Sequence, residues 1–436
     1  MACVRSAQRS QTTTWLLCRF CNIFDKRTQW QHPMNSIGLP QVWRVILPLF
    51  LYSHISASHA ALDKFRPYAF TRAVYDSNLF RVSGKQEAVD VLGSDKRDDR
   101  IYYLGAGIDA DLKVSRQHFL LDAQVQQALY DTYDQLDHVA ALGTATWAWR
   151  VGNVFSGDLG YDYRRELRSF NEDSRPVKDI RTRNQGFFRG GYQIHPDWEL
   201  IAGLTVTDVG YDERTDLDRQ ANSGLFEVQY KNTLNSRVGL RVQLTANDLN
   251  DQVINGIVVS NDYDELNYSG VFYWEGSSKS SFEARVGYTD QRFDELSGRD
   301  FQGYTGRLAY NWKFSGKTKI DFAIWRETST LNDEISNYVL STGASVNPRW
   351  AITPLISLLG LISYENNDYK GNSSLAASLG GEQRKDDLWV YRIGARWQAR
   401  RYLDLYFGFR NASRDSNIDR NDFDDNQAEA RLDFSF

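Results

Sequence analysis

Short segments in which apolar and polar residues alternate strictly recur throughout residues 61–436. In residues 237–246 every even position, from Val238 to Ala246, is apolar and every odd position is polar or glycine. Successive side chains of a β-strand point to opposite faces, so this spacing gives a strand one apolar face. A helix would scatter the same apolar residues around its circumference. The alternation therefore predicts β-strands with one apolar and one polar face.

Eighteen such segments are recognisable, or sixteen if one hairpin is lost. Short links follow the even-numbered segments, and long polar links follow many of the odd-numbered segments. This is the connectivity of a transmembrane antiparallel up-and-down β-barrel. Pro196 and Pro348 are expected in the short turns, because proline lacks a ladder donor. The fold class predicted is all-β. The predicted strands are 66–76, 100–114, 117–130, 138–151, 154–164, 183–195, 198–211, 221–231, 236–247, 263–275, 280–292, 302–314, 317–328, 337–347, 352–364, 387–399, 402–412 and 426–436.

A soluble all-β sandwich would also alternate, but its strands would average five or six residues. Many of these segments have ten or more residues, enough to cross a bilayer at a tilt. A helical membrane protein is excluded because no stretch after residue 60 contains eighteen uninterrupted apolar residues. Aromatic residues make up 14% of the chain while the mean hydropathy is −0.53, as expected when polar residues dilute an aromatic strand face.

The first sixty residues resemble an export signal. Arg44 precedes the short apolar run 45–52, and Ser58 and Ala60 are the small residues of a cleavage site after Ala60. We expect translation to start at Met34, so that residues 1–33 are an upstream over-extension and 34–60 a signal peptide. The barrel would then be residues 61–436, exported to the outer membrane of a Gram-negative cell and embedded in its lipid.

All three cysteines precede residue 22, and the Cys18/Cys21 pair has no second ligand pair. We therefore expect no metal site and no cofactor. Of the chain's 51 basic and 56 acidic residues, six basic and one acidic precede residue 61, so the exported part is acidic and a nucleic-acid partner is not expected. Three histidines follow residue 60, and no G-x-S-x-G elbow occurs, so the chain is predicted not to be an enzyme.

The residues that alternate with the apolar set are expected to face the lumen. Both charge signs occur in similar numbers, so the wall is neither a pure anion nor a pure cation funnel, and ion pairing between strands is an alternative role for any one of them. The few inward aromatic residues could stack on sugars or fill space beside a folded loop. The lumen candidates are Arg150, Arg189, Arg237, Arg241, Arg285, Arg307, Arg392, Arg396, Asp158, Glu227, Glu283, Asp404, Tyr103, Tyr273, Trp325 and Tyr406.

The chain ends on an alternating segment with Leu432, Phe434 and Phe436 on one face. This ending resembles the terminal strand that the bacterial barrel-assembly machinery recognises. We expect that machinery to be a partner.

Residues 75–81 resemble the start of the EpsL-type outer-membrane β-barrels, which are linked to exopolysaccharide biosynthesis. The matching residues are Tyr75, Asp76, Asn78, Leu79, Phe80 and Arg81. The resemblance implies export of a polysaccharide, together with periplasmic or inner-membrane export components as partners. Asp76 and Asn78 could equally form a turn in which their side chains bond nearby backbone.

Three functions are therefore open. The first is a passive conduit for exopolysaccharide export. The alternatives are a general or substrate-specific diffusion porin for small solutes, and a closed-barrel adhesin or outer-membrane enzyme. A constricting loop folded into the bore would favour small solutes. By their length and charge, residues 77–99, 165–182 and 365–386 are the candidate gating loops.

Overall fold

The computed structural model describes residues 64–436 except 172, 235, 255–256, 331–335 and 372–382. The predicted over-extension 1–33 and signal peptide 34–60 lie outside the described residues.

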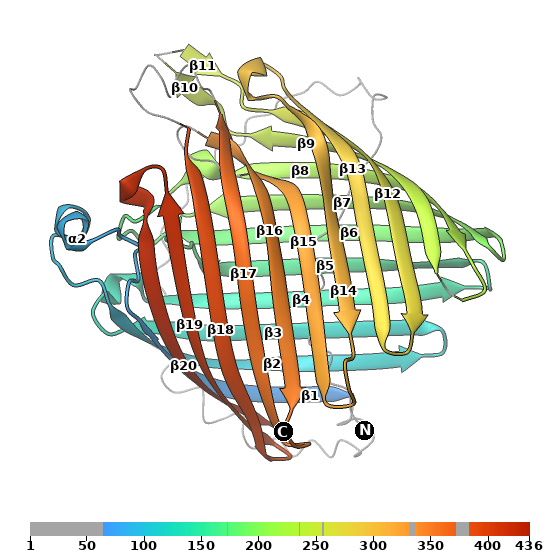
Figure 1. The fold of residues 1–436 in the computed structure, drawn as a ribbon, viewed down its shortest axis with the longest axis horizontal. Coiled ribbons are helices and arrows are strands. Elements are labelled where there is room, and N and C mark those ends of the chain that lie inside the picture. Colours follow the sequence, from blue (N-terminus) through green and yellow to red (C-terminus); the bar gives the residue numbers. More distant parts are fainter. Residues whose placement is uncertain (1–63, 172, 235, 255–256, 331–335, 372–382) are drawn as a thin grey trace, which may run out of the picture.

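Eighteen strands form one closed antiparallel sheet, as predicted (Figure 1). Each strand pairs with its neighbours in sequence, β9 pairs with β12, and β1 pairs with both β2 and β20, which closes the barrel. The barrel strands are β1 (Phe65–Asp76), β2 (Asp99–Val114), β3 (Gln117–Tyr130), β4 (His138–Val151), β5 (Phe155–Leu167), β6 (Ile180–His195), β7 (Trp198–Tyr211), β8 (Arg219–Lys231), β9 (Arg237–Leu249), β12 (Tyr263–Ser277), β13 (Ser280–Phe293), β14 (Phe301–Trp312), β15 (Thr318–Thr330), β16 (Ser336–Ala351), β17 (Ile356–Gly371), β18 (Lys385–Arg400), β19 (Leu403–Ser416) and β20 (Phe423–Ser435).

Short turns join the strands at one end of the barrel, here called the turn end, and longer links join them at the other, the loop end. Residues 115–116 and 196–197 are typical turns, whereas residues 77–98 form the link between β1 and β2. The alternation of short and long links was predicted, but the structure within the long links was not. It consists of α2 (Lys85–Leu92), the hairpin β10 (Gln252–Ile254) and β11 (Ile257–Val259), and the 3-10 turns η3 (Asp134–Leu136), η4 (Thr215–Leu217), η5 (Ser297–Arg299) and η6 (Asp419–Asn421). Among these helices, none is both long and apolar enough to span a bilayer.

The placement of Pro348 in a short turn was wrong. Pro348 lies inside β16, and β17 begins only at Ile356. Pairing of β16 with β17 is interrupted between Val346 and Arg349, so the missing N–H of the proline breaks the ladder on that side alone. A Cβ on Gly360 would lie 2.8 Å from the Pro348 ring, which shows that the glycine makes room for it.

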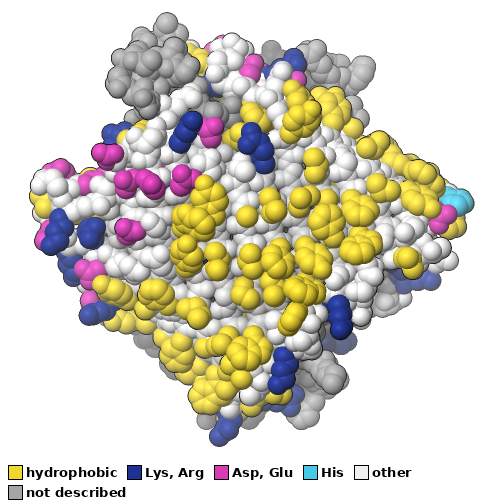
Figure 2. All heavy atoms as spheres, in the orientation of Figure 1, with side chains coloured by type: hydrophobic (Ala, Val, Ile, Leu, Met, Phe, Trp, Pro, Cys, Tyr) yellow, Lys and Arg dark blue, Asp and Glu magenta, His cyan; other side chains and the backbone are white. Residues whose placement is uncertain are grey.

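The apolar members of the strands lie on the outside of the barrel. Leu104, Leu240 and Tyr304 are 68%, 74% and 75% exposed, whereas a soluble fold would bury such side chains. Figure 2 shows a broad band of hydrophobic side chains across the visible face, with acidic side chains gathered toward its loop end. The face of the sheet opposite these side chains is the inner face of the barrel. A closed barrel with an apolar outer surface satisfies every backbone group in a bilayer, which an open sheet cannot do.

Buried apolar residues gather in two clusters near the loop end. One contains Phe80, Leu136 and Phe170, and the other contains Tyr263, Phe293 and Phe301. Both join residues of the long links to strand ends. Packing therefore holds the long links against the barrel instead of filling its middle.

Candidate functional site

The segment after β1 forms a tight turn held by Asp76. One carboxylate oxygen of Asp76 accepts hydrogen bonds from the Asn78 backbone N–H and from Arg81, both at 2.9 Å. The other oxygen accepts from Arg81 at 3.0 Å and from Gln427 of β20 at 2.8 Å. Arg81 adopts the left-handed conformation, with φ of 59°. Its side chain is thereby turned back onto the strand it has just left.

Asn78 completes this turn and ties it to the last strand. Its side-chain amide donates to the Val82 carbonyl at 2.8 Å and to the Asp424 carbonyl at 3.1 Å, and its oxygen accepts from the Val82 N–H at 3.1 Å. Arg81 also forms an ion pair with buried Asp425 at 3.3 Å. Bonding of Asn78 to nearby backbone is the behaviour expected of a turn. The matched segment thus fastens the β1–β2 link to the β1–β20 seam.

This fastening places Phe80 over the inner face of the barrel. Phe80 is 0% exposed and packs edge-on against Phe170 and Tyr133, with ring centroids 4.7 Å away in both cases. The same cluster contains Ile101 of β2 and Tyr130 of β3. Both alternate with outward side chains of their strands and therefore face inward. Three long links, 77–98, 131–137 and 168–179, therefore meet on Phe80 against the wall.

The link between β5 and β6 reaches further across the loop end. Arg414, at the end of β19, donates a hydrogen bond to the Asn171 carbonyl of this link. Asp173 forms ion pairs with Arg168 at 2.7 Å and Arg175 at 2.6 Å within the link, and with Arg214 of the β7–β8 link at 3.1 Å. Partial burial raises the pKa of Asp173, but the hydrogen bonds and charges of Arg175 and Arg168 outweigh it and hold the pKa well below its usual range. The carboxylate therefore stays charged and keeps the link compact at neutral pH.

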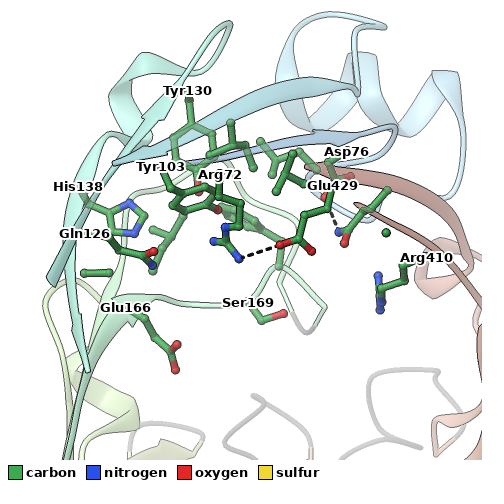
Figure 3. A pocket seen from close by; sticks show the side chains of 18 of the residues that line it. Arg72, Asp76, Tyr103, Gln126, Tyr130, His138, Glu166, Ser169, Arg410 and Glu429 are labelled. Carbon is green, nitrogen blue, oxygen red and sulfur yellow. Dashed lines mark hydrogen bonds and ion pairs between the residues drawn. The ribbon is translucent and has the colours of Figure 1, made fainter. Parts of the chain in front are cut away.

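A cavity of about 470 Å³ lies between these links and the inner face (Figure 3). Arg72 lies 3.8 Å above the Tyr103 ring and forms a 3.8 Å ion pair with Glu429, drawn as a dashed line. Arg392 and Arg410 face each other on β18 and β19; Arg410 pairs with Asp425 at 2.9 Å, whereas Arg392 has no ion pair among the described residues. The lining thus combines tyrosines and charges of both signs with apolar side chains such as Leu79, Ile101 and Phe170.

The structure brings most of the predicted lumen candidates into contact with an opposite charge or an aromatic ring. The contacts are Arg241 with Glu227 at 2.6 Å, Arg189 with Glu227 at 3.9 Å, Arg285 and Arg307 with Glu327 at 2.7 and 3.2 Å, Arg396 with Asp404 at 3.0 Å, Arg237 over Tyr273 at 5.1 Å and Arg307 over Trp325 at 5.4 Å. Tyr103, Tyr406 and Arg392 line the cavity. Ion pairing between strands is therefore frequent on this face, and lining a solute path stays a prediction.

Arg150, Asp158 and Glu283 make none of these ion-pair or aromatic contacts. Asp158 is level with Arg189 in the sheet, yet Arg189 approaches Glu227 instead.

Other inner-face residues were missed. Arg72 follows the same alternation as the predicted set, so the alternation rule could have found it, as it found the inward acid Glu327. Asp425 could not have been found, because its partner Arg81 lies 344 positions away in a link.

No group of three or more metal-ligating side chains occurs in the described part of the chain. His138 is buried, with Nδ1 2.8 Å from the Leu136 carbonyl, and His118 lies 2.8 Å from Asp111 near a turn.

The last strand closes the barrel. The Phe436 N–H donates to the Pro67 carbonyl at 3.0 Å, and Phe434 stacks edge-on with Phe436 at 4.9 Å. Recognition of Leu432, Phe434 and Phe436 by an assembly machinery stays a prediction.

Comparison with known proteins gives a family match over part of the chain. Residues 269–436 match the family model described as "Putative beta-barrel porin 2". This region runs from the middle of β12 to the end of the chain and is less than half of it. No curated protein sequence matches.

Among solved structures, the chain is similar to Pseudomonas aeruginosa OpdK with vanillate, at 13% identity and a TM-score of 0.46, covering 86% of this chain and 99% of that one. It is also similar to Pseudomonas aeruginosa OccK2 in complex with glucuronate, at 11% identity and 0.46, covering 86% and 99%, and to Pseudomonas aeruginosa OprD, at 14% and 0.43, covering 86% and 95%. These similarities concern the fold alone.

Proposed function

We propose that this protein is an outer-membrane channel through which small hydrophilic solutes diffuse selectively. A closed barrel with apolar side chains outside and charged side chains inside is built to span a bilayer around a hydrated interior. The porin family match of residues 269–436 supports the same function.

The observation that favours small solutes is the packing of the β1–β2 link against the inner face. Phe80 and Leu79 are buried there with Phe170 of the β5–β6 link, and the cavity that remains beneath them is about 470 Å³. A cavity of this size is in the range that accepts small molecules.

Exopolysaccharide export rests on the resemblance of residues 75–81. Asp76, Asn78 and Arg81 hold the turn and the β1–β20 seam, so their contacts serve the fold without reference to a polysaccharide. Diffusion of small solutes is therefore the function we favour. Polysaccharide export, with periplasmic export components, is its competitor in the test below.

Liposome swelling tests the proposal. Vesicles containing the purified full-length chain should swell in mono- and disaccharides and amino acids, at rates that fall steeply with solute size, and should exclude polysaccharides. Control vesicles would contain heat-denatured protein. Vesicles that stay impermeable to every small solute would refute a channel, and passage of polysaccharide at a rate similar to that of disaccharides would favour the export function.

A further inference from the structure

Three arginines on the inner face converge on a second, smaller cavity. Arg181 and Arg183 of β6 and Arg219 of β8 line a recess of about 210 Å³. Arg183 and Arg219 are both level with Val209 of β7, the strand between them, and Val209 is only 1% exposed. The two guanidinium groups therefore project from alternate strands over the same buried side chain.

The recess faces the interior of the barrel. Phe188 of β6, Leu204 and Val206 of β7 and Phe226 of β8 are between 41% and 58% exposed on the outer surface. Arg181, Arg183 and Arg219, as well as the recess residues of β7, alternate with these side chains and so point inward. The recess therefore opens to the barrel interior, and this inference rests on the proposed channel.

No acidic residue lines the recess, and none of its three arginines forms an ion pair in the described part of the chain. Asp162 of β5, which forms a 3.5 Å ion pair with Arg164, also acts electrostatically on Arg183 without an ion pair to it, and Glu166, level with Arg181, lines the other cavity. Arg181, Arg164 and Arg219 all act on Arg183 in the opposite sense, so positive charge dominates around the recess. This arrangement differs from that of the inward arginines Arg241, Arg285 and Arg396, which all have acidic partners.

The remaining lining residues are small or neutral. Ala221 leaves space between the strands, and hydroxyl or amide groups surround it. Arg183 donates to Gln185 at 2.7 Å, and Gln185 donates to Thr207 at 3.1 Å, which holds that guanidinium in place. The Arg181 Nε is buried without a hydrogen-bond partner. The neutral polar groups are Gln185, Thr205, Thr207, Ser223, Thr245 and Asn247.

We propose that this recess binds a doubly charged tetrahedral oxyanion, namely a phosphate group, either free or as the monoester of a small solute. A planar guanidinium offers parallel N–H donors that match phosphate oxygens. Three such cations with Asp162 as a neighbouring acid leave a net positive charge, which favours a dianion over a singly charged carboxylate. The hydroxyls of Thr205, Thr207 and Ser223 supply further donors without adding negative charge. The channel would accordingly select phosphorylated small molecules.

The test is the current through the full-length protein in planar bilayers in potassium chloride at pH 7.5. Inorganic phosphate and glycerol phosphate should each reduce the current saturably, with acetate at least about tenfold less effective. Each of Arg183→Gln and Arg219→Gln should raise the half-blocking phosphate concentration about tenfold, the usual effect of losing one charge-assisted hydrogen bond. Arg349→Gln is the matched control, because Arg349 is an inward arginine at the turn end, without an ion pair among the described residues. It should leave the block unchanged.

The two proposals fail in different ways. A wild-type channel that conducts but shows no phosphate block, or an equal block in the recess variants, overturns the recess and leaves the channel standing. Block by acetate equal to that by phosphate overturns the dianion. If the wild type does not conduct, the channel is refuted, and calorimetric titration of inorganic phosphate into the detergent-solubilised protein tests the recess alone. Migration of unheated protein on denaturing gels verifies that each variant is folded.

Discussion

Replacing Phe80 with alanine should release the long links from the inner face and widen the channel. Phe80 is fully buried and makes two edge-on ring contacts at 4.7 Å, with Tyr133 and Phe170. A buried phenylalanine truncated to alanine costs about 3–5 kcal/mol. The strands themselves keep their full ladders, so this cost falls on the docking of the links rather than on the barrel.

A loss of about 3 kcal/mol shifts the equilibrium between docked and undocked links more than about a hundredfold. We therefore expect the Phe80→Ala channel to have a larger single-channel current with more noise, and a higher size limit for sugars in liposome swelling. Phe407→Ala is the matched control, because Phe407 is 55% exposed on the outer surface and removing its ring leaves the links untouched. A folded Phe80→Ala protein with wild-type current and size limit would show that the links do not narrow the path.

Three further predictions concern charges and the chain end. Glu227 is fully buried against Arg241, whereas Asp404 forms a more exposed ion pair with Arg396. In urea unfolding in lipid, Glu227→Gln should therefore lower the free energy of unfolding by about 3–5 kcal/mol and Asp404→Asn by less than about 1 kcal/mol. Equal losses in the two variants would contradict the argument from burial. The pKa of Asp173 is lowered from its ordinary 3.8, so its stabilisation is complete above pH 3.8 and is lost only as the pH falls through the lowered value. Asp173→Asn should accordingly raise current noise by the same amount at pH 5 and at pH 8, and an effect confined to one of these two pH values would contradict the lowered pKa. Deleting Phe436 should lower the yield of assembled barrel in cell envelopes, whereas Phe314→Ala, in a turn, should not; equal yields would argue against an assembly signal at the chain end.

The strands could be predicted because their environment is uniform. In β9, Val238 and Leu240 face outward in a regular alternation, and a period of two requires no knowledge of distant residues. The predicted strand boundaries were less accurate, because the alternation is less regular at strand ends. β6 begins at Ile180 rather than at residue 183, which left Arg181 outside the predicted strand and hid the three-arginine recess. Pro348 was predicted in a turn because proline lacks a backbone N–H, but a strand can contain a proline when only one of its two sides loses pairing. At Pro348, β16 pairs with β15 and loses pairing only on the side of β17.

The contacts of the long links could not be predicted from local pattern. Phe80 belongs to a short motif, but its partners Tyr133 and Phe170 come from two other links. Arg414 reaches Asn171 across 243 positions of sequence. These contacts depend on which links the closed barrel brings to the same end, and alternation carries no information about that. The mixture of charges on the inner face was predictable, whereas the convergence of Arg183 and Arg219 on one recess emerges only from the register of β6 to β8.

Single-channel recording from the purified full-length protein in a planar bilayer tests the central claim most directly. A channel for small solutes predicts discrete, long-lived current steps in potassium chloride that small sugars reduce and large polysaccharides leave unchanged. A bilayer that stays silent while the protein is folded and inserted would contradict it, because a barrel without ionic current offers no diffusion path.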